Sequence, residues 1–154
     1  MIRTKIATAL AAVGVAALTV TALPGAAHAN PEWYSSPASS TVSPLGLRDC
    51  PSTNFCFWDD INYGGPLGKV TGNNRTWTAF RQTACPSGTW NDCASSAYNH
   101  GTTGLGVHVY EHTDYRGLSD CIPRGWYGNL TGRVWDGTWT VINDQISSNY
   151  WAPC

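Results

Sequence analysis

The sequence predicts an all-β domain made of two repeated units and held together by three disulfides. Three observations support this prediction. Short apolar runs alternate with turns rich in Gly, Asn and Asp, two different motifs each recur after 52 residues, and six cysteines occur in a chain of 154 residues. Many short strands separated by Gly-rich turns are typical of a β-sandwich or barrel, and an internal repeat indicates two copies of one structural unit.

Residues 1–29 have the pattern of a secretory signal peptide. Two basic residues precede an apolar, uncharged stretch over 6–23, and an Ala-x-Ala cleavage site lies at 27–29. The alternative is a membrane anchor, because a spanning helix needs roughly 17–25 residues. Pro and Gly at 24–25 and the small residues at the cleavage site favour removal. We therefore expect a secreted, extracellular chain over 30–154 that does not associate with a membrane.

The stretch 30–49 is rich in Ser and Pro, which predicts a flexible leader before an ordered domain over 50–154. After residue 29 the chain has seven basic and ten acidic residues. This balance excludes a strongly basic nucleic-acid-binding protein, so no nucleic acid is expected as a partner.

All six cysteines lie after residue 29. An even number in an exported chain indicates disulfides, and a structural zinc site is less favoured because no Cys-x-x-Cys pair exists. Six cysteines allow many pairings, and the sequence does not select one. As a guess we pair nearest neighbours, so that the last bridge holds the C-terminus: Cys50 with Cys56, Cys85 with Cys93, and Cys121 with Cys154.

Apolar runs at 55–58, 106–110 and 139–142 are the clearest candidate strands. In the second run, Val107 and Val109 would share one face of a strand, because successive side chains point to opposite faces.

The first repeated motif consists of an aromatic residue, four residues, a second aromatic residue, one residue and Gly. It occurs at 58–65 and again at 110–117. Two aromatic rings five residues apart can pack on each other across a folded-over hairpin, and Gly supplies a backbone conformation that a side chain disfavours.

The second repeated motif is Asn-Asp-x-x-Ser-Ser, at 91–96 and 143–148. It offers carboxylate, amide, hydroxyl and carbonyl oxygens at close spacing, which suit a hard cation such as Ca²⁺. The alternative is an Asx or Ser turn that uses the same side chains on its own backbone. Two copies in one repeat favour calcium.

Together these motifs resemble the βγ-crystallin superfamily over 50–154. The resemblance implies two Greek keys, about 50–98 and 106–154, packed as a two-sheet sandwich. It also implies two calcium sites shared between the keys, with Asn91 and Asn143 bracing the loops and Ser96 and Ser148 turned inward. The implied ligands of the first site are Asp92, the carbonyls of Cys93 and Glu111, and the hydroxyl of Ser95; those of the second are Asp144, the carbonyls of Gln145 and Asp59, and the hydroxyl of Ser147.

The Cys- and Pro-containing start at 50–56 and the run 91–99 are more specifically similar to peptidase inhibitor family I36, a secreted group found largely in actinobacteria. This resemblance implies a monomeric, non-enzymatic inhibitor of thermolysin-type metallopeptidases. Such enzymes favour a bulky apolar residue after the bond they address, so Cys121-Ile122 is the candidate inhibitory loop. The alternative is an ordinary strand end tied to the C-terminus.

Two other functions stay open. One is a calcium-stabilised secreted module without inhibitory activity. The other is a carbohydrate- or cell-wall-binding or toxin-like protein, in which exposed Trp rings stack on sugars instead of filling the core; the candidates are Trp77, Trp126, Trp135 and Trp139.

An enzyme is not expected. No Gly-x-Ser-x-Gly motif accompanies the Ser, His and Asp residues. His108 and His112 lack the Glu of a His-Glu-x-x-His metal motif, because Val109 stands in its place.

Overall fold

The computed structural model describes residues 45–154, which form two antiparallel β-sheets connected by turns, four 3-10 helices and two longer loops over 71–95 and 133–147. The predicted signal peptide and residues 30–44 of the predicted leader lie outside the described residues. Within 45–154 no helix is long and apolar enough to cross a membrane. In chain order the elements are η1 Leu45–Asp49, β1 Phe55–Trp58, η2 Ile61–Tyr63, β2 Leu67–Val70, β3 Ser96–Asn99, β4 Gly106–His112, η3 Thr113–Tyr115, β5 Arg116–Ile122, β6 Tyr127–Asn129, η4 Leu130–Gly132 and β7 Ser148–Ala152.

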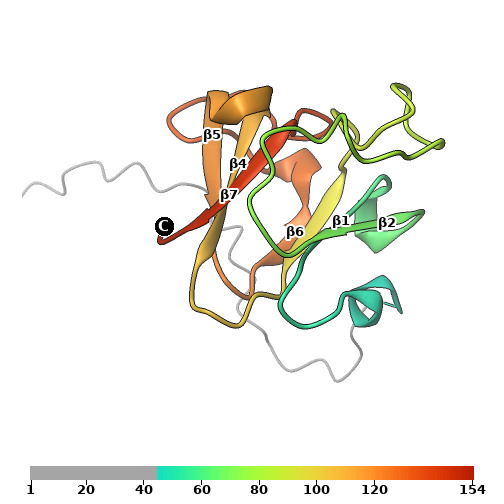
Figure 1. The fold of residues 1–154 in the computed structure, drawn as a ribbon, viewed down its shortest axis with the longest axis horizontal. Helices are drawn as coiled ribbons and strands as arrows, with labels where there is room; N and C mark the ends of the chain where they lie inside the picture. Colours follow the sequence, from blue (N-terminus) through green and yellow to red (C-terminus); the bar gives the residue numbers. More distant parts are fainter. Residues whose placement is uncertain (1–44) are drawn as a thin grey trace, which may run out of the picture. The chain divides into compact units, whose positions relative to one another are not determined.

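The two sheets exchange strands between the halves of the chain. The four-stranded sheet has the order β2-β1-β3-β6, and the three-stranded sheet has the order β5-β4-β7 (Figure 1). Strand β6 comes from the second half and pairs with β3 of the first half, with Tyr127 opposite Tyr98. In return, Asn74 of the first half bridges to Asn149 in β7. The two predicted Greek keys are therefore interlocked: the second gives strand β6 to the sheet of the first, and the first contributes a single bridge at Asn74 to β7 of the second.

The main core lies between the sheets. Phe57 stacks on Trp77 with ring centroids 4.2 Å apart and meets the edge of Trp90 at 4.9 Å. From the other sheet Val107 and Val109 are fully buried, which confirms that they share the inner face of their strand. Full burial of aromatic and branched side chains contributes roughly 1.5–3 kcal/mol each, and it fixes the register of the strands that carry them.

Ordered structure begins before Cys50, where the leader was predicted to end. Residues 45–49 form η1, and Leu47 is buried in a second, smaller cluster with Cys50, Cys56 and Trp58. The Ser- and Pro-rich composition predicted no ordered structure here. One apolar side chain, Leu47, packed beside the Cys50–Cys56 disulfide holds this single helical turn.

The three predicted disulfides are all present: Cys50–Cys56, Cys85–Cys93 and Cys121–Cys154. The last ties the C-terminal residue to β5. Gly106 at the start of β4 leaves room for it, since a β-carbon there would overlap both sulfur atoms.

The aromatic-x4-aromatic-x-Gly motifs form the same corner twice. Trp58 and Tyr63 pack edge to face with ring centroids 5.3 Å apart, and Tyr110 and Tyr115 pack at 5.7 Å. The motif glycines have left-handed backbones, with φ of 68° at Gly65 and 79° at Gly117. This confirms the predicted hairpin corner and the reason for its glycine.

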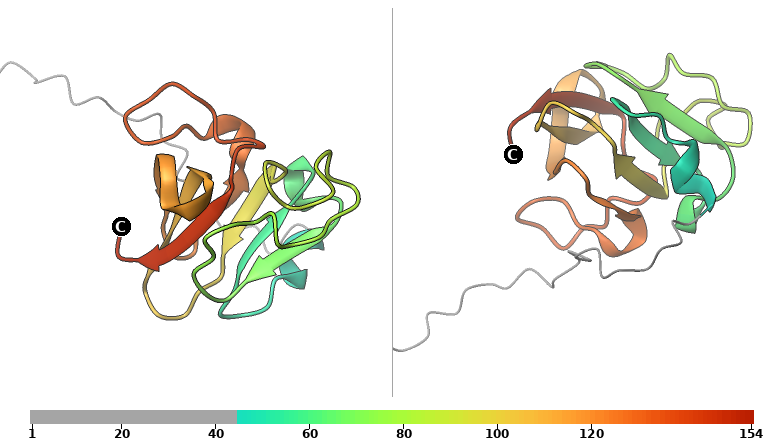
Figure 2. Two further views of the ribbon diagram at one scale, coloured as in Figure 1. Left: turned by 45° about the horizontal axis from the view of Figure 1, so that its top comes forward. Right: turned by 90° about the horizontal axis from the view of Figure 1, so that it is seen from below.

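The candidate strand over 139–142 was wrong. Only Val141 pairs, in an isolated bridge with Val134, and Trp139 is 90% exposed. A strand needs a neighbouring strand to hydrogen-bond with along its length. Residues 139–142 have only the single bridge partner Val134, so the segment from η4 to β7 forms a loop. In both views of Figure 2 this orange-red segment extends beyond the strands.

Replacing Cys121 and Cys154 together with Ala would open a ring with a sequence separation of 33. In the loop-entropy model this lowers the free energy of unfolding by about 3–4 kcal/mol. Because Cys154 is exposed, little packing is lost at that end of the bridge. We expect urea denaturation to show this loss with the far-ultraviolet circular dichroism of the folded state retained. An unchanged denaturation midpoint would contradict the proposed contribution of the bridge.

Candidate functional site

The two Asn-Asp-x-x-Ser-Ser turns lie against each other. The backbone N–H of Asp92 donates to the carbonyl of Ile146 at 3.1 Å, and that of Asp144 donates to the carbonyl of Ala94 at 3.0 Å. Each acceptor lies two residues after the aspartate of its own turn, so the contact is reciprocal. Segments 91–96 and 143–148, far apart in the sequence, therefore form one paired structure.

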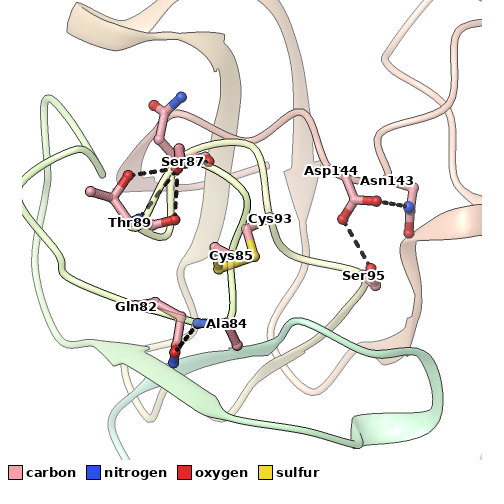
Figure 3. The surroundings of a disulfide bond; sticks show 10 residues. Gln82, Ala84, Cys85, Ser87, Thr89, Cys93, Ser95, Asn143 and Asp144 are labelled. Carbon is pink, nitrogen blue, oxygen red and sulfur yellow. Dashed lines mark hydrogen bonds between the residues drawn. A yellow bond between two sulfur atoms is a disulfide. The ribbon is translucent and has the colours of Figure 1, made fainter.

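Each aspartate meets the serine of the opposite turn. The hydroxyl of Ser95 donates to Asp144 Oδ1 at 2.9 Å (Figure 3), and the hydroxyl of Ser147 donates to Asp92 Oδ1 at 3.0 Å. The sequence analysis grouped Asp92 with Ser95 and Asp144 with Ser147 as calcium ligands, whereas the hydrogen bonds in the structure join each aspartate to the serine of the opposite turn. The reciprocal backbone bonds bring each aspartate beside the residue that precedes the serine of the other turn.

Asn91 and Asn143 brace the turns, as predicted. Each donates from its side-chain nitrogen to Oδ2 of the following aspartate, at 2.6 Å in both copies. Asp92 and Asp144 have left-handed backbones, with φ of 55° and 54°, a region that Asp and Asn tolerate better than most residues. The carboxylates are thus held at one oxygen by their own turn and at the other by the opposite turn.

The second serine of each turn connects it to the aromatic hairpin of its own half. The hydroxyl of Ser96 donates to the carbonyl of Asp60 at 2.8 Å and accepts from the backbone N–H of Tyr63 at 3.0 Å. Ser148 makes the equivalent bonds to His112 and Tyr115. Both serines are fully buried, which confirms their predicted inward, structural role.

The first group of oxygen donors borders a surface hollow. Asp92, Ser147 and Glu111 line it, so the structure brings together three of the predicted ligand residues from two turns and one hairpin. Further lining residues are Thr78, Asn91, His112, Thr113 and Arg116. The sequence analysis did not place the two basic residues of this hollow, His112 and Arg116, beside the oxygen donors. Comparison of the two repeats could have revealed the difference in charge, because His112 stands where the first copy has Asp60.

The second group of oxygen donors comprises Asp144, Ser95 and the hairpin that carries Asp59. Here the neighbours are acidic. Burial raises the pKa of Asp59, and the negative charge of Asp60 raises it further. A carboxylate that is difficult to ionise among like charges is a place where a cation lowers the free energy.

Burial also raises the pKa of Asp92 in the first group. The hydrogen bond from Ser147 and the charge of His112 act in the opposite direction. The two groups therefore have equivalent hydrogen-bond geometry but different electrostatic surroundings.

The donor chemistry of both groups fits a calcium ion. Within 45–154, three buried side-chain oxygens have no hydrogen-bond donor: Asp59 Oδ1, Asn91 Oδ1 and Asn143 Oδ1. Buried polar atoms normally have hydrogen-bond partners. Carboxylate and amide oxygens without such a partner are of the kind that coordinates a hard cation. In the described part of the chain no three His, Cys, Asp or Glu side chains lie so that they alone could hold a metal ion, so further ligands would be hydroxyl and carbonyl oxygens.

The side chains of two predicted ligands have other partners. Cys93 is bonded to Cys85, and the amide oxygen of Gln145 accepts from the indole N–H of Trp135 at 3.0 Å. Only their backbone carbonyls are free to serve, as the sequence prediction assumed.

The predicted inhibitory loop at Cys121-Ile122 was wrong. Both residues lie in β5, where Cys121 is opposite His108 and Ile122 is opposite Val107. Ile122 is fully buried in the core, so no peptidase reaches it in the folded domain. The alternative of an ordinary strand end tied to the C-terminus is correct, because an alternating strand must direct every second side chain inward.

Only one of the four tryptophans considered for sugar stacking is available. Trp77, Trp126 and Trp135 are buried in the main core, and Trp139 is exposed. A flat face made of several aromatic rings is therefore not formed by these residues.

Similar solved structures define the class of fold. A structure described as concerning the evolution of the eye lens βγ-crystallin domain fold is 23% identical, covers 68% of this chain and 90% of its own, and superposes with a TM-score of 0.52. A βγ-crystallin from Ciona intestinalis is 19% identical with a TM-score of 0.46, covering 64% and 98%. A βγ-crystallin domain from Clostridium beijerinckii is 24% identical with a TM-score of 0.43, covering 64% and 97%. The first likeness establishes a βγ-crystallin fold.

The family model of peptidase inhibitor family I36 matches residues 45–122, just over half of the chain. The chain belongs to this family. Membership confirms that the protein is not an enzyme and implies a peptidase as its partner. A search of the curated proteins found no similar sequence.

Replacing Ser96 with Ala would remove the hydroxyl that joins the carbonyl of Asp60 to the N–H of Tyr63. Leaving buried polar groups without a partner costs about 1–3 kcal/mol, so we expect thermal unfolding at a lower temperature. Ser148→Ala is the matched variant in the second half and should have a similar effect. Ser52→Ala, at an exposed turn, is the control that should unfold like the wild type. If the buried variants were as stable as this control, the serines would not hold the hairpins.

Proposed function

We propose that the chain is a secreted, calcium-binding inhibitor of metallopeptidases of the thermolysin type that acts as a monomer. Family membership carries the inhibitory part of this proposal. The three disulfides support export, because disulfides form and persist in oxidising compartments.

The crossed aspartate–serine pairs support the calcium part. Asp92 with Ser147 and Asp144 with Ser95 would each give one carboxylate and one hydroxyl oxygen, from opposite halves of the chain. The carbonyls of Glu111 and Cys93, and of Asp59 and Gln145, are the further proposed ligands of the two sites. A bound ion supplies positive charge between the two turns, so it should stabilise the folded pairing of the halves.

The charges around the two groups indicate unequal sites. Asp59, Asp60 and Asp144 lie at one group, while Arg116, Glu111 and His112, which is charged only when protonated, line the hollow at the other. Nearby cations oppose a divalent ion and nearby carboxylates favour it. We therefore propose that the site with Asp144 binds calcium more tightly than the site with Asp92.

Calcium titration by calorimetry should resolve a tighter and a weaker event. Asp144→Ala should remove the tighter event and Asp92→Ala the weaker one. Saturation should raise the unfolding temperature, since a ligand at a hundred times its Kd stabilises by about 2.7 kcal/mol. Asp49→Ala, an exposed acid in η1, is the matched control and should keep both events. Calcium-independent melting of the wild type would refute the calcium proposal, and loss of the weaker event in Asp144→Ala would refute the ranking.

The inhibitory proposal is tested with the purified mature protein against thermolysin and against a serine endopeptidase such as subtilisin. We expect stoichiometric inhibition of thermolysin and no inhibition of subtilisin at the same concentration. Inhibition of subtilisin alone would place the target outside the metallopeptidases. If the protein melted at a higher temperature with calcium but inhibited neither enzyme at micromolar concentration, a calcium-stabilised module without inhibitory activity would be the better description.

A further inference from the structure

One large apolar side chain has no cover within the described residues. Trp139 is 90% exposed, and Val141 beside it is 38% exposed. The other tryptophans described are buried or partly buried. Trp139 lies at the end of the loop over 135–140, here called the Trp139 loop, which extends beyond the sheets (Figure 2).

The backbone of the Trp139 loop is held from within. The N–H of Trp135 donates to the carbonyl of Thr140 at 3.0 Å, and the N–H of Thr138 donates to the carbonyl of Trp135 at 3.0 Å. The hydroxyl of Thr138 also donates to the carbonyl of Trp135 at 2.9 Å and accepts from the N–H of Thr140 at 3.1 Å. The side chain at 139 is thus presented on an ordered loop, which reduces the entropy lost on binding.

The loop is also anchored to the rest of the domain. The N–H of Asp136 donates to the carbonyl of Ser119 at 3.0 Å. Val134 and Val141 pair where the loop closes, and fully buried Trp135 lies at its base. The loop is therefore fixed relative to the core, so Trp139 can contact a partner without a rearrangement of the loop.

The fold does not require an aromatic residue at this position. In the first half of the chain Arg81 and Thr89 form the bridge that Val134 and Val141 form in the second half. The second loop is one residue shorter, because Val134 follows Arg81 by 53 residues and Val141 follows Thr89 by 52; counted back from the second bridge partner, Ser87 stands where the second half has Trp139. Ser87 closes its loop with hydroxyl hydrogen bonds and no apolar side chain, and the exposed ring of Trp139 does not fill the core, so the ring is available for a contact outside the domain.

We propose that Trp139 inserts into an apolar side-chain pocket of the target peptidase, so that the Trp139 loop is the inhibitory contact. This inference rests on the proposed function. It replaces Cys121-Ile122, whose Ile122 is buried, by Thr138-Trp139, whose bulky apolar residue is exposed. Tryptophan is enriched among the residues that dominate binding energy at protein interfaces.

A peptidase pocket suits this loop better than other occupants. A sugar-stacking platform would use several exposed rings, and the other three candidate tryptophans are buried. A lipid surface would attract basic residues, and the only charged residue over 135–141 is Asp136. A single projecting ring on a narrow, rigid loop fits a concave, apolar recess.

The experiment compares inhibition of thermolysin by wild type, Trp139→Ala, Trp139→Phe and Ile61→Ala. Loss of the ring should weaken inhibition by about thirtyfold or more, the effect typical of an interface hot spot. Trp139→Phe should recover most of it. Ile61→Ala removes a different apolar side chain, 49% exposed, and should inhibit like the wild type. All variants should melt at the wild-type temperature, because neither side chain packs in the core.

A second measurement locates the contact directly. Oxidative footprinting read by peptide mass spectrometry should modify Trp139 in the free protein and protect it in the thermolysin complex. If Trp139→Ala inhibited as strongly as the wild type, or if Trp139 of the wild type stayed unprotected in the complex, this inference would be overturned while the proposed function stayed intact. No inhibition by the wild type would overturn both. Binding of the wild type to chitin or peptidoglycan, or self-association, that Trp139→Ala abolishes would overturn the inference in favour of a glycan or a second copy.

Discussion

The structure depends on the reciprocal contact between the turns at 91–96 and 143–148. Each turn donates a backbone N–H to the other and receives a serine hydroxyl on its aspartate. The inner serines then join each turn to its aromatic hairpin. This chain of hydrogen bonds couples the two halves, and the exchanged strands β6 and the segment at Asn74 make the coupling mutual. An ion bound by these aspartates, as proposed, would act on the same coupling and would therefore change the stability of the domain.

Repetition and divergence have separate consequences here. The aromatic corners, the left-handed aspartates and the inner serines are equivalent in both halves, because each holds a backbone conformation on which the fold relies. Side chains that face solvent differ between the halves. Asp60 is replaced by His112, and Ser87 by Trp139. The backbone tolerates these changes because neither position fills the core. Differences in charge and partner contact between the halves are therefore located at such positions, while the shared residues maintain the scaffold.

The local sequence around Cys121-Ile122 did not predict whether these residues are exposed. An apolar residue beside a cysteine and a proline is compatible with a rigid exposed loop and with a strand end, and the sequence of β5 does not separate the two. Pairing of β5 with β4 decided it, because alternation directed Ile122 into the core. Conversely, the apolar run at 139–142 had the composition of a strand but found only a one-residue partner. Whether a side chain is exposed depends on the segments that pack against it in the fold. The exposure of Ile122 and of residues 139–142 therefore could not be predicted from their own sequences.

The sequence by itself determined the all-β class, the duplication, the presence of disulfides, the hairpin corners and the residues of the two turns. Each of these follows from local spacing or from a repeat that is visible along the chain. Only the tertiary structure decided that the aspartates pair with serines across the halves, that η1 begins before Cys50, and that Trp139 rather than Ile122 is exposed. The physical reason is the same in all three cases: they depend on which distant segment packs beside the residue, and a one-dimensional pattern does not specify that distance.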